Sequence, residues 1–424
     1  MCAVQSIQDV KLLIDPSNSH NHKIHYFAFL RTRNQNKGLT PSLTQHIKIK
    51  NLIILFMSQP FTIRNYEPGD EHGLVELLQL VFNGWPHFDI PCTSLEHWKW
   101  KYLDNPYKKR TIPIAIIGDK VVGSNHGVTR RVKLFDKMLL CSQGTDLTVH
   151  PDYRRMGIYA KTSGYKTQHY KDNGFSFAWA VTGNPIVFDS NIEWGRRSSP
   201  HRVNTLIRVN DIDLHFKMKE KGDDVLRQMG AKVLKGLGDL SLHLSRPLSK
   251  DEVDYKLNEI NAFDDGYSMF WKSVQPSYDL IYERSPEYMN WRYLDRRAGD
   301  FKVIAAIADG VWLGYIIYRI NRYNKDYPET YIADILTLPG RSEVASELIS
   351  EVNRRIDKEQ LNVIYSWAIE NNSYFEILQR EGYLNSRYNP YFIYQNISLT
   401  SEWEEMYRVN PGRMQVHFGD CDWV

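Results

Sequence analysis

The most constraining feature of the sequence is an internal repeat with a spacing of about 190 residues. The motif Trp-Lys-Tyr-Leu-Asp at 100–104 recurs as Trp-Arg-Tyr-Leu-Asp at 291–295. Three further pairs follow in the same order: Gly123 with Gly314, Pro151 with Pro339, and Asn184 with Asn371. The offset drifts only from 191 to 187 along these matches, which is hard to obtain by chance. The sequence therefore predicts one fold present twice.

The hydrophobic pattern gives both copies the same order of elements. An aromatic helix around Trp100 or Trp291 precedes two strands with a tight turn, a third strand, a helix, a strand, a helix and a final strand. After the aromatic helix, the predicted ranges are 112–117, 121–134, 139–149, 157–172, 175–181, 185–194 and 203–209 in the first copy, and 302–308, 311–320, 330–338, 342–358, 361–369, 372–381 and 390–397 in the second. Helices that follow strands and return to them predict mixed α/β sheets with right-handed crossovers. The expected fold class is α/β, with two similar domains in tandem.

Changes in composition along the chain predict the domain limits. Residues 1–56 are rich in Asn, Ser, Thr, His and Gln without a sustained helical or strand period, so we expect an N-terminal extension that is disordered or not native. The first folded domain is predicted at 57–210 and the second at 286–424. The charged segment 211–285 between them is expected to form a connecting arm with a helix at 223–237.

Composition and charge exclude several classes of protein. The chain is 42% hydrophobic and 24% charged, as in soluble globular proteins, and no apolar run approaches the ~18 residues of a membrane span. Residues 1–56 carry a charge of +5 and the rest −2, so no basic stripe on the folded body favours a nucleic-acid partner. Four widely separated cysteines and the lack of a secretory signal predict reduced thiols in a cytoplasmic protein. The histidines show no ligand spacing, so no metal site is expected.

The clearest chemical signal follows the third strand of the first copy. The apolar run ends at Val149, Pro151 stops the strand, and Gly157 stands where the next helix begins. The first backbone N–H groups of that helix lack intrahelical partners, and the positive end of the helix dipole lies behind them. Arg154 and Arg155 add formal charge, and glycine lets a phosphate approach the backbone closely. This order predicts an anion site that suits a phosphate group.

The pattern Val149-x-Pro151-x-x-Arg154-x-x-Gly157-Ile158 resembles the acetyl-CoA-binding motif of the GNAT N-acetyltransferases. The run from Asn184 to Gly195 resembles the helix that closes the cofactor site in that family. The resemblance covers about 60–210 as a full domain and about 286–400 as a weaker copy, similar to tandem GNAT proteins with one intact and one degenerate domain. The common form of the motif has glycine where this sequence has Arg155 and Tyr159.

The resemblance implies acetyl-CoA as the co-substrate, with no metal. The strand at 143–149 would splay from the strand at 175–181, and the pantetheine arm would lie in the gap like an added strand. A backbone N–H near Leu147 would then face the thioester oxygen. The residues implied in cofactor binding are Leu147, Thr148, Val149, Arg154, Arg155, Met156, Gly157, Ile158, Tyr159 and Asn184. The second copy lacks the matching arginine and helix-start glycine, and Glu343 would oppose a phosphate, so that copy is expected to bind no CoA.

Acyl transfer to an amine calls for a base, because a protonated amine cannot attack a thioester, and the departing thiolate can use an acid. Asp146, beside the expected oxyanion position, is the first candidate for the base, and a structural carboxylate is the alternative reading. Many GNAT proteins place a tyrosine acid seven residues after the position of Asn184. That residue is Asn191 here, which leaves Tyr159 or solvent as the proton source.

Two other segments are candidates for binding the acceptor. Trp85 and His87 lie on a proline-flanked loop, and aromatic side chains there suit an amino sugar. The acidic C-terminal segment would bring Asp420 or Asp422 to a cationic amine. In the alternative reading, this segment is a strand that Phe418 and Trp423 dock on the second sheet.

We therefore predict an acyl-CoA-dependent N-acyltransferase that moves acetyl from acetyl-CoA to a primary amine of a small molecule within a ternary complex. The alternatives are a non-catalytic acyl-CoA-binding or scaffold protein and a tandem-GNAT aminoacyl transferase that uses charged tRNA. The intact phosphate motif and the slightly negative body disfavour the tRNA-dependent enzyme. The sequence leaves the oligomeric state open.

Overall fold

The computed structural model describes residues 61–199, 201–219, 254–386 and 389–422. The extension expected at 1–56 and the helix expected at 223–237 lie outside these ranges. None of the helices in the described ranges is long and apolar enough to cross a bilayer.

The first sheet is mixed and contains nine strands. Its main path runs β1-β2-β3-β4-β5-β15-β6, with β9 on the far part of β3 and β16 on β9. The strands are β1 (Thr62–Asn65), β2 (Pro113–Ile117), β3 (Lys120–Leu134), β4 (Lys137–Val149), β5 (Phe177–Thr182), β6 (Arg197–Ser198), β9 (Leu280–Tyr282), β15 (Tyr391–Asn396) and β16 (Met414–Gln415). The parallel pair β4–β5 is joined by a helix, as the predicted crossover requires.

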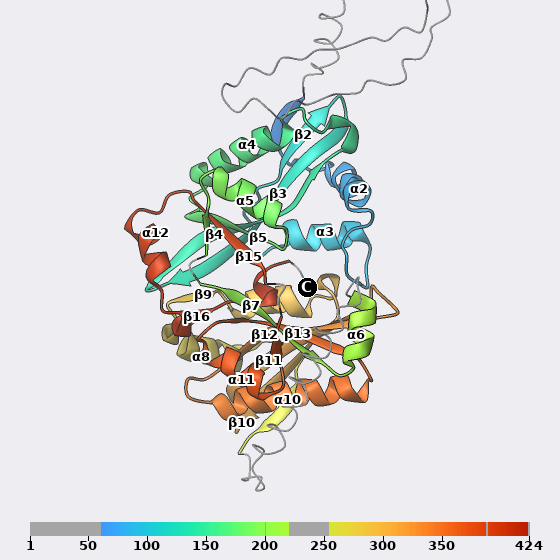
Figure 1. Cartoon of the computed structure of the whole chain (residues 1–424). Coiled ribbons are helices and arrows are strands. Elements are labelled where there is room, and N and C mark those ends of the chain that lie inside the picture. Colours follow the sequence, from blue (N-terminus) through green and yellow to red (C-terminus); the bar gives the residue numbers. More distant parts are fainter. Residues whose placement is uncertain (1–60, 200, 220–253, 387–388, 423–424) are drawn as a thin grey trace, which may run out of the picture. The chain divides into compact units, whose positions relative to one another are not determined.

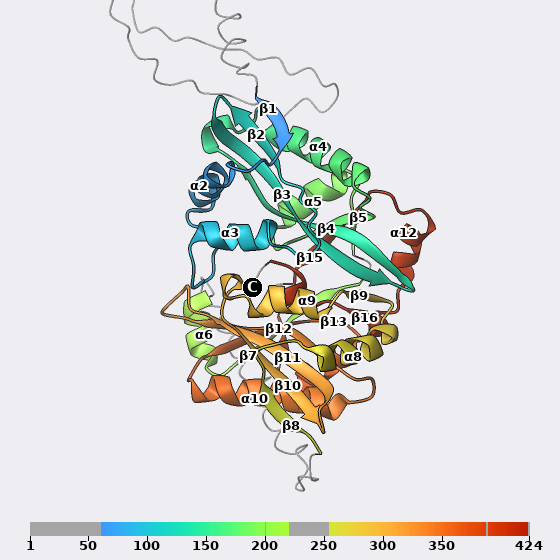
Figure 2. The same cartoon turned by 180° about the vertical axis from the view of Figure 1, so that it is seen from behind.

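The second sheet has seven strands in the order β14-β7-β13-β12-β11-β10-β8. Its strands are β7 (Val203–Val209), β8 (Lys256–Glu259), β10 (Phe301–Ala308), β11 (Val311–Asn321), β12 (Glu329–Thr337), β13 (Val363–Ile369) and β14 (Leu384–Asn385). Each has a counterpart in the first sheet, so the observed strands confirm the repeat and the mixed α/β class. The described part of the expected arm at 211–285 supplies strands to both sheets, β8 to the second and β9 to the first (Figure 2).

The helices predicted at 157–172, 185–194, 342–358 and 372–381 are observed within a residue or so of these ranges as α4, α5, α10 and α11, and the structure adds helices for which the sequence predicted no range. The α-helices in the described ranges are α2 (Glu71–Phe82), α3 (Ser94–Tyr102), α4 (Ile158–Asp172), α5 (Pro185–Glu193), α6 (Ile212–Lys219), α8 (Asp265–Val274), α9 (Pro286–Met289), α10 (Ser342–Lys358), α11 (Ser373–Arg380) and α12 (Ser401–Glu405). Helix α4 packs on β2 and β3, and α10 packs in the same way on β10, β11 and β12 (Figure 1). The apolar stripe of α10 is fully buried, because Val344, Leu348 and Val352 follow the 3.6-residue period.

The two halves exchange their last strands, which corrects the assignment of 203–209 to the first copy and 390–397 to the second. β7 pairs antiparallel with β13 of the second sheet, and β15 pairs antiparallel with β5 of the first. In Figure 1 the red β15 lies beside β5, and the green β7 lies among the orange strands. The exchange is possible because β5 and β13 are equivalent strands, and each accepts an antiparallel neighbour on the same side. As a result, each sheet contains strands from both halves of the chain.

The repeated tryptophans meet each other at the centre of this arrangement. The rings of Trp100 and Trp291 stack with centroids 5.0 Å apart. Trp100 Nε1 donates to the carbonyl of Trp291 at 2.9 Å, and Trp291 Nε1 donates to the carbonyl of Trp100 at 3.2 Å. Such reciprocal contacts are the signature of a two-fold relation between similar units. The largest buried core is accordingly shared by the two sheets.

Candidate active site

The predicted anion cradle is formed by the start of α4. Gly157 precedes the helix with φ of 79°, and Arg155 has φ of 67°, so two residues just before α4 adopt the left-handed conformation that is common in backbone anion sites. No side chain caps this end of α4, and its first turn has no acidic residue. A Cβ at Gly157 would meet nothing within 4 Å. The cradle therefore faces open space with unpartnered donors and a favourable dipole.

The predicted splay lies beside the cradle. β4 and β5 pair over only three residues each, and the last pair joins Gln143 with Trp179. Beyond it Asp146 forms a bulge with φ of 43°, where the register between β3 and β4 shifts. Bulges of this kind bend a strand and aim its groups away from the ladder. The next residue, Leu147, is 43% exposed, so this part of β4 has an edge that is open to a ligand.

The splay opens into a cavity of about 420 Å³. One end, called here the acceptor end, is lined by Phe82, Asp146 and Asp422. The other end, called here the inner end, lies between α4 and the sheet. It is lined by residues of α4 and by small residues of the strands, together with Asn125 and Gln395: Ser163, Lys166, Thr167 and Tyr170 from α4, and Gly144, Ala178 and Ala180 from β4 and β5.

Asp146 lies at the acceptor end with 10% of its side chain exposed, and it accepts three hydrogen bonds. Lys101 Nζ lies 2.7 Å from Oδ2, Trp85 Nε1 lies 3.0 Å from Oδ1, and the Tyr102 hydroxyl also donates to Oδ2. Burial alone would raise the pKa of Asp146, but the ammonium of Lys101 and the other donors outweigh it and lower the pKa. Asp146 is therefore a stable carboxylate, and a weak proton acceptor.

Asp422 reaches the same cluster from the C-terminal segment. Its Oδ2 accepts from Lys101 Nζ at 2.9 Å, and its Oδ1 accepts from Gln143 Nε2 at 2.7 Å. Lys101 thus bridges two carboxylates, and these raise its pKa although burial opposes them. Asp420, the other acidic candidate, is buried on Arg284, away from the cavity lining.

The remaining predicted residues fall into three groups. Arg154, Arg155 and Gly157 are exposed around the cradle. Thr148, Val149, Met156 and Ile158 pack beneath it, with Ile158 buried in a small core and the Thr148 hydroxyl 2.7 Å from that of Ser124. Asn184 caps α5 by accepting from the N–H of Ile186 at 2.9 Å, and lies next to the cavity wall without lining it.

Trp85 and His87 take different places. Trp85 is buried and acts on the cavity through its bond to Asp146. His87 is exposed, and its Nε2 lies 2.8 Å from the carbonyl of Phe82, outside the cavity lining.

Tyr159, the candidate proton donor, and Asn191, which stands where the family often has tyrosine, both line the cavity. Tyr159 lines the cavity, and its ring stacks on Trp194 with centroids 4.9 Å apart. Asn191, at the position where GNAT proteins often have tyrosine, donates to the carbonyl of Val187 and accepts from Arg196. Asn191 is thus held in structural contacts, and Tyr159 remains the candidate proton donor among the residues that line the cavity.

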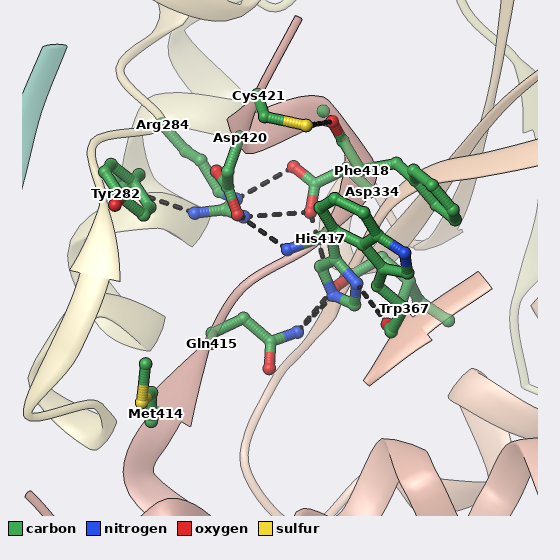
Figure 3. Close-up of polar contacts among 12 residues, drawn as sticks. Tyr282, Arg284, Asp334, Trp367, Met414, Gln415, His417, Phe418, Asp420 and Cys421 are labelled. Carbon is green, nitrogen blue, oxygen red and sulfur yellow. Dashed lines mark hydrogen bonds and ion pairs between the residues drawn. The ribbon is translucent and has the colours of Figure 1, made fainter. Parts of the chain in front are cut away.

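The equivalent splay of the second copy is filled by the chain itself. β12 and β13 pair only at Thr330–Ile364 and Tyr331–Tyr365, and the C-terminal segment then enters between them. One ring nitrogen of His417 lies 3.1 Å from the carbonyl of Ile335 on β12, and the other lies 3.0 Å from the carbonyl of Trp367 on β13 (Figure 3).

Charged and aromatic contacts lock this segment in place. Arg284 donates to Asp334 at 2.8 and 3.1 Å and to Asp420 at 3.1 Å, and all three are buried (Figure 3). Phe418 stacks on Trp367 with centroids 4.1 Å apart. These contacts dock the segment on the second sheet, but as a 3₁₀ turn at Phe418–Asp420 and not as the expected strand. Trp423 lies outside the described residues. The start of α10, like that of α4, has no side-chain cap, but its first turn carries Glu343, which pairs with Arg341.

Sequence reasoning missed two lysines of the site. Lys101 occupies the second position of the repeated motif, where the second copy has Arg292, and Arg292 donates to the carbonyls of Gly419 and Cys421. A cationic residue at the same position in both copies could therefore have identified Lys101 as a candidate from the sequence. Lys166 gave no signal, because a lysine on a helix is usually solvated, and only the packing of α4 shows that it is buried.

The comparisons with known proteins agree with this architecture. Residues 62–187 match the family model described as an acetyltransferase (GNAT) domain. The Saccharomyces cerevisiae N-myristoyltransferase with bound myristoyl-CoA is a structural neighbour at a TM-score of 0.54 and 13% identity, over 79% of this chain and 79% of that chain. A GCN5-related N-acetyltransferase from Anabaena variabilis is similar at a TM-score of 0.54 and 12% identity, over 80% of this chain and 73% of that one. No curated protein matches the sequence.

The fold is thus that of the GNAT-type N-acyltransferases, with two such units in tandem. Residues 62–187 form a GNAT acetyltransferase domain, as the sequence motif predicted. This class of domain supports acyl transfer in general.

Proposed function

We propose that the protein is an N-acyltransferase that uses an acyl-CoA, of which acetyl-CoA is the simplest, to acylate a primary amine of a small molecule in a ternary complex. The observation that carries the proposal is the open splay between β4 and β5 next to the uncapped start of α4. A diphosphate suits the cradle of N–H groups, and an extended pantetheine arm suits the open edge of β4.

The chemistry follows from what these groups do. The bulge at Asp146 turns backbone around Leu147 toward the gap, where an N–H stabilises the oxyanion that forms when the amine attacks the thioester carbon. The C–N bond forms, the C–S bond breaks, and the thiolate takes a proton from Tyr159 or from solvent. Because Lys101 lowers the pKa of Asp146, we assign Asp146 to holding the acceptor amine rather than to taking its proton.

The acceptor end fits a cationic amine. Asp146 and Asp422 present two carboxylates against one ammonium, that of Lys101, so the cluster retains a net negative charge. A protonated amine is attracted to this end and then passes its proton to water before attack. The proposed acceptor is a small primary amine, and aromatic Phe82 supplies an apolar wall.

The test is release of free thiol from acyl-CoA in the presence of a panel of primary amines. We expect turnover that Asp422→Asn slows through a raised KM for cationic amines, while the exposed Asp152→Asn, outside the cavity lining, serves as the matched control. CoA binding without release on a broad panel would instead support a non-catalytic acyl-CoA-binding protein.

A further inference from the structure

The cavity measures about 420 Å³ over its two ends together, and its inner end is lined by small residues of the strands. The room exists because the strands present Gly144, Ala178 and Ala180 toward α4. A Cβ at Gly144 would lie 3.9 Å from the Cβ of Ala180 and 3.6 Å from Lys166 Nζ, so these groups share one wall.

Lys166 places an amine at this inner end. Its side chain is buried, and Nζ donates to Asn125 Oδ1 at 2.8 Å and to the carbonyl of His126. Both acceptors are neutral, and no ion pair joins Lys166 to a carboxylate within the described ranges. Both carboxylates of the cavity, Asp146 and Asp422, are bound by Lys101 at the acceptor end.

The surroundings of Lys166 are polar and lean toward positive charge. Arg196 also lines the cavity, and Asn125, Ser163, Thr167, Tyr170 and Gln395 add neutral polar groups. A purely hydrocarbon chain would cover these groups without replacing their hydrogen bonds, which is costly. An acyl chain that ends in a carboxylate would pair with the ammonium and satisfy them.

We propose that the inner end binds the acyl group of the donor, and that this group is a short chain with a terminal carboxylate held by Lys166. The donor class is therefore a dicarboxylic acid monothioester of CoA. This inference rests on the proposed function and deepens it, because it names the acyl group that the same site transfers.

The protonation of Lys166 gives the proposal a second readout. Burial, reinforced by Arg196 and opposed by Asp146, lowers the pKa of Lys166 to about 7. The other titratable groups that face it are His126 on β3, which burial keeps neutral, and Tyr170, whose pKa is raised. A carboxylate that binds to Lys166 must then draw a proton onto it above pH 7.

The experiment measures binding by titration calorimetry of CoA, butyryl-CoA and succinyl-CoA. We expect succinyl-CoA to bind at least tenfold more tightly than butyryl-CoA at pH 6.5, with the preference falling as the pH rises from 7 to 8.5. Titrations above pH 7 in two buffers of different ionisation enthalpy should show proton uptake with succinyl-CoA that is absent with butyryl-CoA.

Variants separate the inference from the proposed function. Lys166→Met should abolish the preference and the proton uptake while CoA itself binds as before, and the exposed Lys171→Met is the matched control on the same helix. Should Lys166→Met fail to fold, Ala180→Leu fills the inner end and should remove the preference in the same way. Wild-type binding of CoA with butyryl-CoA equal to or tighter than succinyl-CoA overturns this inference alone. Failure of CoA itself to bind overturns the proposed function and this inference together.

Discussion

The two copies use the same gap between diverging parallel strands in opposite ways. Between β4 and β5 the gap opens into a cavity, and the start of α4 is uncapped. Between β12 and β13 the gap is filled by the C-terminal segment, and the start of α10 carries Glu343. Strands that diverge leave backbone groups without ladder partners, and these need some partner. The comparison teaches that the same divergence of strands leaves an open cavity in one copy and a gap filled by the chain itself in the other.

The largest expected effect comes from loosening the filled gap. Arg284→Met leaves Asp334 and Asp420 buried without their cation, which should cost about 3–5 kcal/mol in the free energy of unfolding. Denaturant unfolding measures the loss, with the exposed Arg354→Met as a control that should change stability little. A loss below about 1 kcal/mol would mean that the segment is not held by this network.

The next effect tests the open gap. Gly157→Val and Gly174→Val both place a side chain at positive φ with free space around it, at opposite ends of α4. The two variants should lose similar amounts of unfolding free energy, about 1–2 kcal/mol each. Only Gly157→Val should weaken CoA binding, by roughly 30-fold or about 2 kcal/mol, because only its side chain covers the cradle. Equal weakening by both variants would place the diphosphate elsewhere.

A smaller effect concerns stability against pH. The folded pKa of Lys166 lies near 7, below that of the unfolded chain, so the unfolded state binds more protons between pH 7 and 10. The stability of the wild type relative to Lys166→Met should therefore rise with pH in this window, by at most about 1.4 kcal/mol per unit. Lys171→Met gives the flat reference curve. If the stability difference between the wild type and Lys166→Met also stays constant with pH, the Lys166 amine is hydrated and its pKa is not lowered.

The smallest effect concerns Arg155 in the cradle. A φ of 67° destabilises a non-glycine residue by about 1–2 kcal/mol. Glycine avoids this strain, but its greater entropy in the unfolded chain reduces the gain by about 0.5–1 kcal/mol. Arg155→Gly should thus gain a few tenths to about 1 kcal/mol of stability. Arg154→Gly should gain none, because Arg154 has φ of −64°. Equal changes in the two variants would contradict the strain argument.

Local signals predicted the cradle and most elements of the fold. Helix α4 was expected at 157–172 and is observed at Ile158–Asp172, since Gly157 and the apolar spacing act within a few residues. The splay between β4 and β5 followed from the motif. The cluster around Asp146 did not, because Lys101, Asp422 and Trp85 come together only through contacts between distant parts of the chain.

The sequence by itself determined that one mixed α/β unit occurs twice, and it predicted a phosphate cradle in the first copy alone. These features depend on periodicity, glycine and charge over short distances. Only the tertiary structure decided that the final strands are exchanged, that the C-terminal segment fills the second gap, and that Lys166 is buried in the first. Each of these features depends on contacts between segments that are far apart in the chain and that have nearly equivalent alternative partners. Side-chain packing in the core shared by the two sheets selects one partner over the other.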